Sequence, residues 1–263
     1  ITLGDLMQSA QAFQQMTGAL SWPVNNLGGI AEWRASVERV LGLLRVFQTV
    51  DSEVARADHW IQVRGSDRQV LTLRDLNIAL YDGPVLCENI NMEIHEGDHV
   101  LITGNRHHGA KLFRAIAGIR PWGSGTIELP AKGRLFFMPP RPHLPTGTLQ
   151  EAIWYPALRR RFTREQVEST MRLVGLEHLI DQLDTEDHWL NNLTRNEQQL
   201  LGMVRLLINR PQWIFLQEAF DSLKPAEEEA MLRLICEQLP HATVVAISHI
   251  PESSTFFTRH LPL

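Results

Sequence analysis

Apolar residues follow two different periods along the chain after residue 69. Short apolar or alternating runs bounded by Gly or Asp have the form of β-strands, at 70–80, 86–94 and 99–103. Helical periodicity then appears at 112–117, 164–174, 196–207 and 226–238. Apolar runs at 213–216 and 243–247 lie between and after these helices, as the buried strands of a parallel sheet do. The pattern predicts an α/β fold with an added antiparallel β part.

The first 32 residues have a different character, because their only charged residues are Asp5 and Glu32. They contain no run of 18 apolar residues, so a lone membrane-spanning helix is not established. Gln11, Gln14 and Gln15 would suit the interior of a helix bundle. A membrane helix and a helix outside the membrane both stay open at this point.

Residues 32–47 predict an amphipathic helix that needs a partner surface. Its apolar positions recur at helical spacing, at Trp33, Val37, Val40, Leu41, Leu44 and Phe47. Residues 51–68 are charged and irregular, which indicates a linker and a domain boundary. We therefore predict three parts, a helical part over 1–50, a linker over 51–68 and a main domain over 69–263.

Composition and charge exclude several classes of protein. Apolar residues make up 44% of the 263 residues and charged residues 21%, which is the mixture of a globular protein. The 25 Lys and Arg residues against 30 Asp and Glu give a net charge of -5, so nucleic acid is not an expected partner. Cys87 and Cys236 lack a metal-type spacing and indicate neither a disulfide framework nor a zinc site. Because the chain opens at Ile1 without a targeting signal, we expect it to be cut from a longer protein.

The strand over 99–103 is followed by a glycine-bounded stretch and then a helix, which is the setting of a phosphate-binding loop. That stretch reads Gly104-Asn105-Arg106-His107-His108-Gly109. In a P-loop, glycines let backbone N–H groups close around phosphate, a Lys follows the second glycine and a hydroxyl next to it holds magnesium. Here Ala110 stands at the Lys position, Lys111 at the hydroxyl position, and Leu112 follows. Two glycines alone are equally typical of an ordinary strand-to-helix turn.

Tracts in the second half of the chain carry a more specific pattern. They read Leu193-Thr194-Arg195-Asn196-Glu197-Gln198-Gln199, then Trp213-Ile214-Phe215-Leu216-Gln217-Glu218-Ala219, and finally Ser248-His249 after an apolar run. With Ile116-Ala117-Gly118, Gly123-Ser124-Gly125 and Gly147-Thr148-Leu149, the chain resembles the nucleotide-binding domain of an ABC transporter preceded by the end of its transmembrane domain. It is similar to bacterial inner-membrane half-transporters of the YddA type and to the subfamily D transporters. The resemblance implies a P-loop NTPase fold and an ATP-driven pump in which two such domains sandwich ATP.

Several positions that touch ATP or magnesium in that family carry other residues here. The first loop lacks the phosphate Lys and is one residue short before Leu112. The resemblance places Pro140 at the Gln that senses magnesium and Gln217 at the Asp that holds it. In the signature motif, Thr194, Arg195 and Asn196 stand where the resemblance implies a Ser and adjacent glycines that would contact the partner's ATP.

Three family positions keep a usable side chain. The resemblance makes Glu218 the base that orients the attacking water, His249 the γ-phosphate switch and Tyr81 the adenine-stacking aromatic. Each also has an ordinary reading, as a solvated strand-end carboxylate, a locally bonded histidine and an edge-strand aromatic. His107 and His108 invite a metal hypothesis, but adjacent histidines point apart without a third ligand, so we predict no metal site there.

We expect weak or lost ATP binding, lost magnesium binding and little or no ATP hydrolysis. Three functions stay open: a weakly active ABC ATPase, a non-catalytic module that docks on its transmembrane domain or a partner, and a functionless remnant. The resemblance implies as partners the chain's own transmembrane domain and a second nucleotide-binding domain in a homodimer. It also implies a location on the cytoplasmic face of the bacterial inner membrane. The transported substrate leaves no trace in this sequence.

Overall fold

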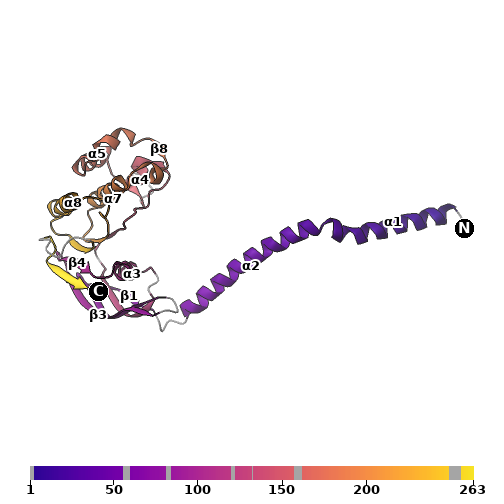
Figure 1. The fold of residues 1–263 in the computed structure, drawn as a ribbon, viewed down its shortest axis with the longest axis horizontal. Helices are drawn as coiled ribbons and strands as arrows, with labels where there is room; N and C mark the ends of the chain where they lie inside the picture. Colours follow the sequence, from indigo (N-terminus) through magenta and orange to yellow (C-terminus); the bar gives the residue numbers. More distant parts are fainter. Residues whose placement is uncertain are drawn as a thin grey trace. The chain divides into compact units, whose positions relative to one another are not determined.

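The chain forms two compact units, Ile1–Asp58 and His59–Leu263. The structure is a computed structural model that describes residues 3–55, 60–80, 84–119, 122–131, 133–156, 162–248 and 256–263. Figure 1 shows the fold, with the long helices of the first unit in indigo and violet.

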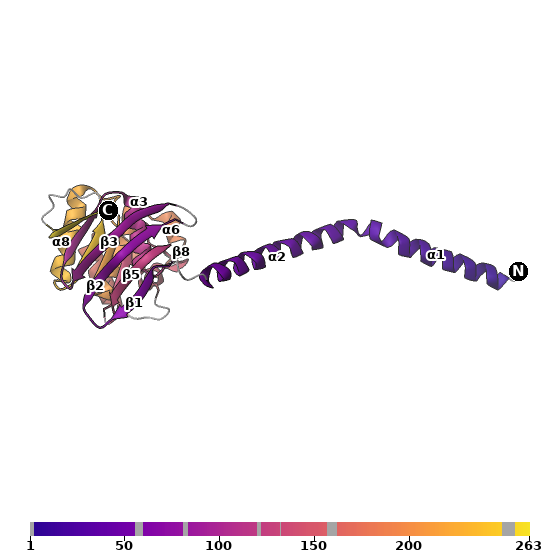
Figure 2. The same ribbon diagram turned by 90° about the horizontal axis from the view of Figure 1, so that it is seen from below.

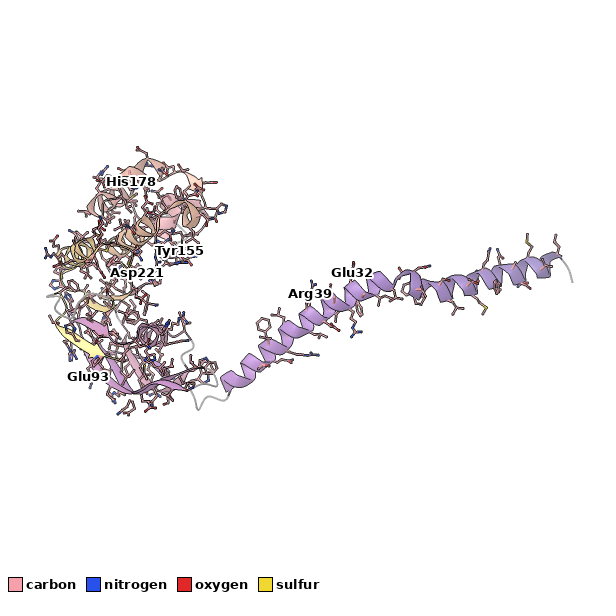
Figure 3. All side chains as sticks on the ribbon, in the orientation of Figure 1. Glu32, Arg39, Glu93, Tyr155, His178 and Asp221 are labelled. Carbon is pink, nitrogen blue, oxygen red and sulfur yellow. The ribbon has the colours of Figure 1, made fainter. Side chains whose placement is uncertain are left out.

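The first unit consists of helices α1 (Leu3–Asn25) and α2 (Leu27–Ala55). Asn26 lies between them, and its N–H donates to the Trp22 carbonyl at 3.0 Å. Pro23 lies inside α1, and the helix ends two residues later. Large apolar side chains are exposed along both helices, including Phe13 (72%), Leu20 (75%) and Trp33 (68%). Figure 3 shows side chains projecting from both helices, among them the labelled Glu32 and Arg39.

The amphipathic helix expected over 32–47 is confirmed as part of the longer α2. Among the described residues, no helix combines the length and the apolar character needed to cross a bilayer. The irregular linker expected over 51–68 is wrong in two places. Helix α2 continues to Ala55, because no Gly or Pro stops it, and strand β1 occupies Gln62–Ser66. The sequence pattern missed β1 because this edge strand has mostly exposed side chains and is held by backbone pairing with β5 (Gly123–Pro130).

A five-stranded parallel sheet forms the centre of the second unit, in the order β11-β4-β10-β9-β6. Its strands are β4 (His99–Thr103), β6 (Leu135–Met138), β9 (Trp213–Gln217), β10 (Thr243–Ile247) and β11 (Arg259–Pro262). The expected strands at 99–103, 213–216 and 243–247 are confirmed. Since all five strands are parallel, their carboxyl ends share one edge of the sheet, where ligands bind in open α/β folds.

A second sheet has the order β1-β5-β2-β3, and Figure 2 shows its strands side by side. Strand β2 (Val70–Ala79) pairs antiparallel with β3 (Val85–His95) and with β5, while β1 runs parallel to β5. The predicted antiparallel β part is therefore confirmed.

Helices and two hydrophobic cores separate the layers. Helix α3 (Arg106–Ile116) lies between the two sheets, where Leu112 and Phe113 join one core with Val245 and Ile247. The alternate residues of β10, Val244 and Ala246, join the other core, under the helices that cover the opposite face of the sheet. Those helices are α4 (Leu149–Trp154), α5 (Arg164–Leu173), α6 (Trp189–Asn192), α7 (Arg195–Asn209) and α8 (Pro225–Gln238). A 3-10 helix η2 (Glu177–Gln182) and the short strands β7 (Gly147–Thr148) and β8 (Glu186–Asp187) complete the unit.

One buried charge ties α7 to α4. Arg205 is only 6% exposed and donates through Nε and Nη2 to the Ala152 carbonyl, with its guanidinium carbon 5.6 Å from the centre of the Tyr155 ring. Burial lowers the pKa of Arg205 to about 10. The labelled Tyr155 marks this place in Figure 3.

Candidate functional site

The turn between β4 and α3 is much shorter than the sequence suggested. We expected a loop over Gly104–Gly109 followed by the helix, but α3 begins at Arg106, so that expectation is wrong. Asn105 is the N-cap residue, with extended backbone, and His107, His108 and Gly109 form the first turn of α3. A side-chain amide able to cap the helix explains the early start, because Asn is among the favoured N-cap residues.

Asn105 accepts hydrogen bonds from three consecutive backbone amides. Its Oδ1 accepts from the His107 N–H at 2.9 Å, and its carbonyl accepts from the N–H groups of His108 (3.0 Å) and Gly109 (3.1 Å). The free N–H groups of a helix N-terminus otherwise attract anions such as phosphate. In this chain, oxygen atoms of Asn105 accept from two of those donors, at His107 and His108, while the bond from Gly109 is the first regular bond of the helix.

Packing explains why both ends of this stretch, Gly104 and Gly109, are glycine. Gly104 has φ +108, and a Cβ placed on it would lie 2.2 Å from the backbone oxygen of Leu263. At Gly109 a Cβ would lie 2.8 Å from Cδ1 of Ile247, so this glycine lets α3 approach β10. Ala110 and Lys111 are half-buried in the same helix, and Leu112 is buried in the core.

The end of β9 carries Gln217 and Glu218 at the same edge of the parallel sheet. Glu218 has a positive φ of 45, which is rare for a residue with a Cβ, and its N–H donates to the Ile247 carbonyl at 2.7 Å. The bond joins the end of β9 to the end of β10. Both side chains are half-buried.

The signature-like residues form the start of α7. Thr194 is its N-cap in a capping box, where Thr194 Oγ1 accepts from the Glu197 N–H and the Glu197 carboxylate accepts from the Thr194 N–H at 2.8 Å. Partial burial alone would raise the pKa of Glu197, but hydrogen bonds from Thr194 and His178 hold it below its usual value. Arg195 and Asn196 follow as exposed residues of the first turn.

One cavity of about 510 Å³ brings three of the predicted residues together, Pro140, Arg195 and Gln217. Its apolar wall includes Phe137 and Phe215, whose rings stack at 4.6 Å. From α3, Phe113 and Arg114 in the second half of the helix line this cavity. The structure therefore groups the predicted residues into two places, the β4–α3 turn and this cavity.

Sequence reasoning missed a polar network at the cavity wall. Gln199 is fully buried, and its Nε2 donates to the Pro140 carbonyl at 3.0 Å and to Asp221 Oδ1 at 2.5 Å. Arg195 Nη2 donates to Asp221 Oδ2 at 2.7 Å. Asp221 is labelled in Figure 3. The signal available in the sequence was Gln199 itself, an amide one helical turn after Arg195 within a tract of core residues.

Comparison with known proteins supplies relatives along the whole chain. It is 30% identical over 265 residues to an uncharacterized ABC transporter ATP-binding protein of Haemophilus influenzae, covering 100% of this chain and 44% of that protein. It is 29% identical over 253 residues to the inner membrane ABC transporter ATP-binding protein YddA of Escherichia coli, covering 95% and 43%. The chain is a homologue of ABC transporter ATP-binding proteins over its whole length. The predicted resemblance is thereby confirmed.

The resemblance to subfamily D proteins is confirmed as well. ABC transporter D family member 1 of Dictyostelium discoideum is 28% identical over 192 residues, which is 68% of this chain and 26% of that protein. No protein-family model matches the chain. The chain spans less than half the length of the curated relatives it matches. The α/β fold with its parallel sheet agrees with the P-loop NTPase fold that ABC relatives imply.

Two of the residues carried over from the ABC pattern, Tyr81 and His249, lie outside the described residues. Over the part of the chain that the structure describes, no three His, Cys, Asp or Glu side chains gather as a metal site. Gln217, which the ABC pattern predicts at the magnesium position, has a neutral amide, whereas magnesium prefers carboxylate and phosphate oxygens.

Proposed function

We propose that the chain is the ATP-binding-cassette domain of a membrane transporter that hydrolyses little or no ATP and acts as a non-catalytic structural or partner-binding module. The observation that carries this proposal is the β4–α3 turn. Its first-turn amides at His107 and His108 are bonded to Asn105 rather than open to a phosphate group.

The side chains near this turn support the same conclusion. Ala110 offers no charge to a terminal phosphate, and Lys111 is one residue further along α3. A step of one residue turns a side chain by roughly 100° around a helix axis, so Lys111 does not simply replace the missing Lys. Together with the occupied amides, this leaves magnesium–ATP a poor fit to the residues present.

The residues at the magnesium and water positions add further losses. Pro140 has no N–H and no side-chain acceptor, and Gln217 has no charge. Removing one preorganised donor to developing charge costs ~10² to 10³ in rate. Even when such losses are partly non-additive, several of them together leave turnover near background.

The proposed partners are a transmembrane domain, which the chain's first 50 residues would complete, and a second nucleotide-binding domain in a homodimer. The support lies in the exposed apolar side chains of α1 and α2 and in the uncharged stretch from residue 6 to 31. The name of YddA places that relative in an inner membrane, and we propose the same location, with this domain on the cytoplasmic face.

Calorimetric titration with ATP, with and without magnesium, tests the nucleotide proposal. We expect no saturable heat in the micromolar range, because the phosphate and magnesium ligands are absent. YddA purified in the same buffer is the matched positive control. A low-micromolar Kd that tightens with magnesium contradicts the proposal.

A second candidate, a weakly active ATPase, is favoured by one observation, the positive φ of Glu218. Unusual backbone angles at a non-glycine residue are concentrated at functional sites. Under our proposal, Glu218→Gln leaves any ATP hydrolysis at the background level of the unchanged chain. A clear fall in a measurable rate with this variant favours the weakly active enzyme instead.

Truncation tests the membrane proposal separately. We expect the full chain to need detergent to stay monodisperse and a chain of residues 60–263 to need none. The cut falls before β1, because that strand belongs to the sheet of the second unit. A full chain that is monodisperse without detergent contradicts the proposal.

A further inference from the structure

Three chain segments meet at the carboxyl edge of the parallel sheet and are joined by hydrogen bonds. They are the segment after β6, the first turn of α7, and the loop that leads from β9 to α8. Asp221, in that loop, uses both carboxylate oxygens, since Oδ2 accepts from Arg195 Nη2 at 2.7 Å and Oδ1 accepts from Gln199 Nε2 at 2.5 Å.

Gln199 forms the centre of the arrangement. Besides its bond to Asp221, its Nε2 donates to the Pro140 carbonyl at 3.0 Å, and its Oε1 accepts from the Ser222 N–H at 3.2 Å and from the Ser222 hydroxyl. The two donors and two acceptor positions of the amide are thus all used, with no exposure to solvent. A fully satisfied buried polar network fixes a single arrangement of the groups that form it.

Arg195 extends this network to the surface. It is 26 residues from Asp221 in the chain, and its side chain is 47% exposed while that of Asp221 is only 19% exposed. The pair is a charge-assisted hydrogen bond, which is shorter and stronger than a neutral one. The carboxylate therefore lies between an exposed cation and a buried amide, and the charge of Arg195 is compensated within the same domain.

We propose that Arg195 and Asp221 form an internal latch that holds the β9–α8 loop against the start of α7 and the segment after β6 in place of a bound nucleotide. This inference rests on the proposed function, in which the site does not hold magnesium–ATP. The latch makes the order of this edge depend in part on this ion pair, beside the Gln199 network, and therefore in part on ionic strength, since a half-exposed pair is partly screened by salt.

Amide hydrogen exchange of the full chain in detergent, without nucleotide, tests the latch. The reporters are the Ser222 N–H, bonded to Gln199, and the Leu223 N–H, bonded to the Phe220 carbonyl at 2.9 Å. We expect Arg195→Gln to speed exchange at both by about tenfold, in keeping with the loss of one charge-assisted hydrogen bond. Arg195→Lys keeps the charge, so its exchange rates at both amides should stay within about threefold of those of the unchanged chain. Adding ATP and magnesium to the unchanged chain should likewise change these rates by no more than about threefold.

Arg233→Gln is the matched control, because Arg233 forms an exposed ion pair with Glu229 on α8, outside the network. It should leave both reporter amides unchanged. The latch is overturned if Arg195→Gln alters them by less than twofold, or if Arg195→Lys is as harmful as Arg195→Gln, since charge would then not be the cause. Slower exchange of the unchanged chain with ATP and magnesium would contradict the proposed function. The latch itself is still tested by comparing Arg195→Gln with the unchanged chain in the absence of nucleotide.

Discussion

The β4–α3 turn and the β9–α8 loop lie at the same edge of one parallel sheet, and each is closed by hydrogen bonds of a different range. At the first turn, Asn105 bonds to amides two to four residues away. At the second, Gln199 and Arg195 reach Asp221 from another element, and Gln199 also reaches Pro140, 59 residues away. In both segments the polar groups of the protein itself make these hydrogen bonds.

The difference shows two ways in which hydrogen bonds within the protein can tie down segments at the carboxyl edge of a parallel sheet. A local cap depends on one residue and on the backbone around it, so a change of that residue or of loop length should reopen it. A long-range network depends on several segments being folded together, so single changes should loosen it without removing it. The predictions below test this distinction from the largest expected effect to the smallest.

Restoring the first turn to ABC form should have the largest effect. The variant combines Ala110→Lys, Lys111→Thr and one inserted Ser after residue 111 with Gln217→Asp and Pro140→Gln. We expect ATP affinity to rise by at least ~100-fold, because several charge-assisted bonds at ~1.5 to 3 kcal/mol each become available. Calorimetry and an ATP-dependent thermal shift measure it. A folded variant that shows no thermal shift would mean that the local cap is not what prevents binding.

Gly104→Ala should destabilise the fold more than any other single change at the first turn. Its Cβ would meet the backbone oxygen of Leu263 at a φ of +108, so Gly104 or Leu263, whose N–H donates to the Thr103 carbonyl, must shift. We expect a loss of about 3 kcal/mol in the free energy of unfolding. Gly97→Ala is the control, because it has φ +86 with open space around it and should cost only about 1 kcal/mol. Equal losses in denaturant unfolding would show that packing against Leu263 is unimportant.

Asn105→Ala should lower stability by about 1 kcal/mol through loss of the N-cap. Asn105→Asp keeps a capping oxygen and adds a charge that suits a helix N-terminus, so it should stay within a few tenths of a kcal/mol of the unchanged chain. Thermal unfolding of the 60–263 chain measures both, at roughly 2–4 °C per kcal/mol for a domain of this size. If Asn105→Ala instead matches the unchanged chain, the first-turn amides find other acceptors.

Glu197 gives the smallest and most pH-dependent effect. Because its pKa is lowered in the folded state from an ordinary 4.5, its carboxylate stabilises the fold above that pH, and the contribution is lost as pH falls through the lowered value. Glu197→Gln keeps the capping box but not the charge, and should cost a few tenths of a kcal/mol at pH 7 and progressively less as the pH falls through the lowered pKa of Glu197. Glu165→Gln, an exposed first-turn residue of α5, is the control. If the difference in the free energy of unfolding between Glu197→Gln and the unchanged chain does not shrink on acidification, the effect comes from packing or hydrogen-bond geometry rather than from the charge.

The sequence predicted the positions of the buried strands well. Strands β4 and β10 have the limits that the apolar runs indicated, because Val, Leu and Ile on both faces of a central parallel strand leave a clear signal. Edge strands β1 and β11 gave no such signal, since polar residues such as Arg64, Arg259 and His260 are exposed on them and the strands depend on partners elsewhere in the chain.

The candidate site was less accessible to sequence reasoning. The ABC pattern pointed to Arg106–Gly109 as a loop, and only the capping bond of Asn105 turns these residues into helix. Arg195 was noted as a replaced glycine, but its ion pair joins α7 to a loop beyond the next strand. A sequence without coordinates does not show which of many carboxylates such a side chain meets.

Strand β1 also determines how mechanical load enters the second unit. It is the first element after the helices of the first unit, and it pairs with β5 through five residues, from Gln62 opposite Thr126 to Ser66 opposite Pro130. A pull transmitted along the chain from α2 would reach the second unit first at Trp60, which forms a bridge with Trp122, and at the buried Ile61, and then at this edge strand. Parallel pairing distributes such tension over several backbone hydrogen bonds when it acts along the strand, whereas tension across the strand would open them one at a time. The five residue pairs of β1 and β5, together with the Trp60–Trp122 bridge, would therefore be the first backbone pairings to carry tension that arrives from the helical unit.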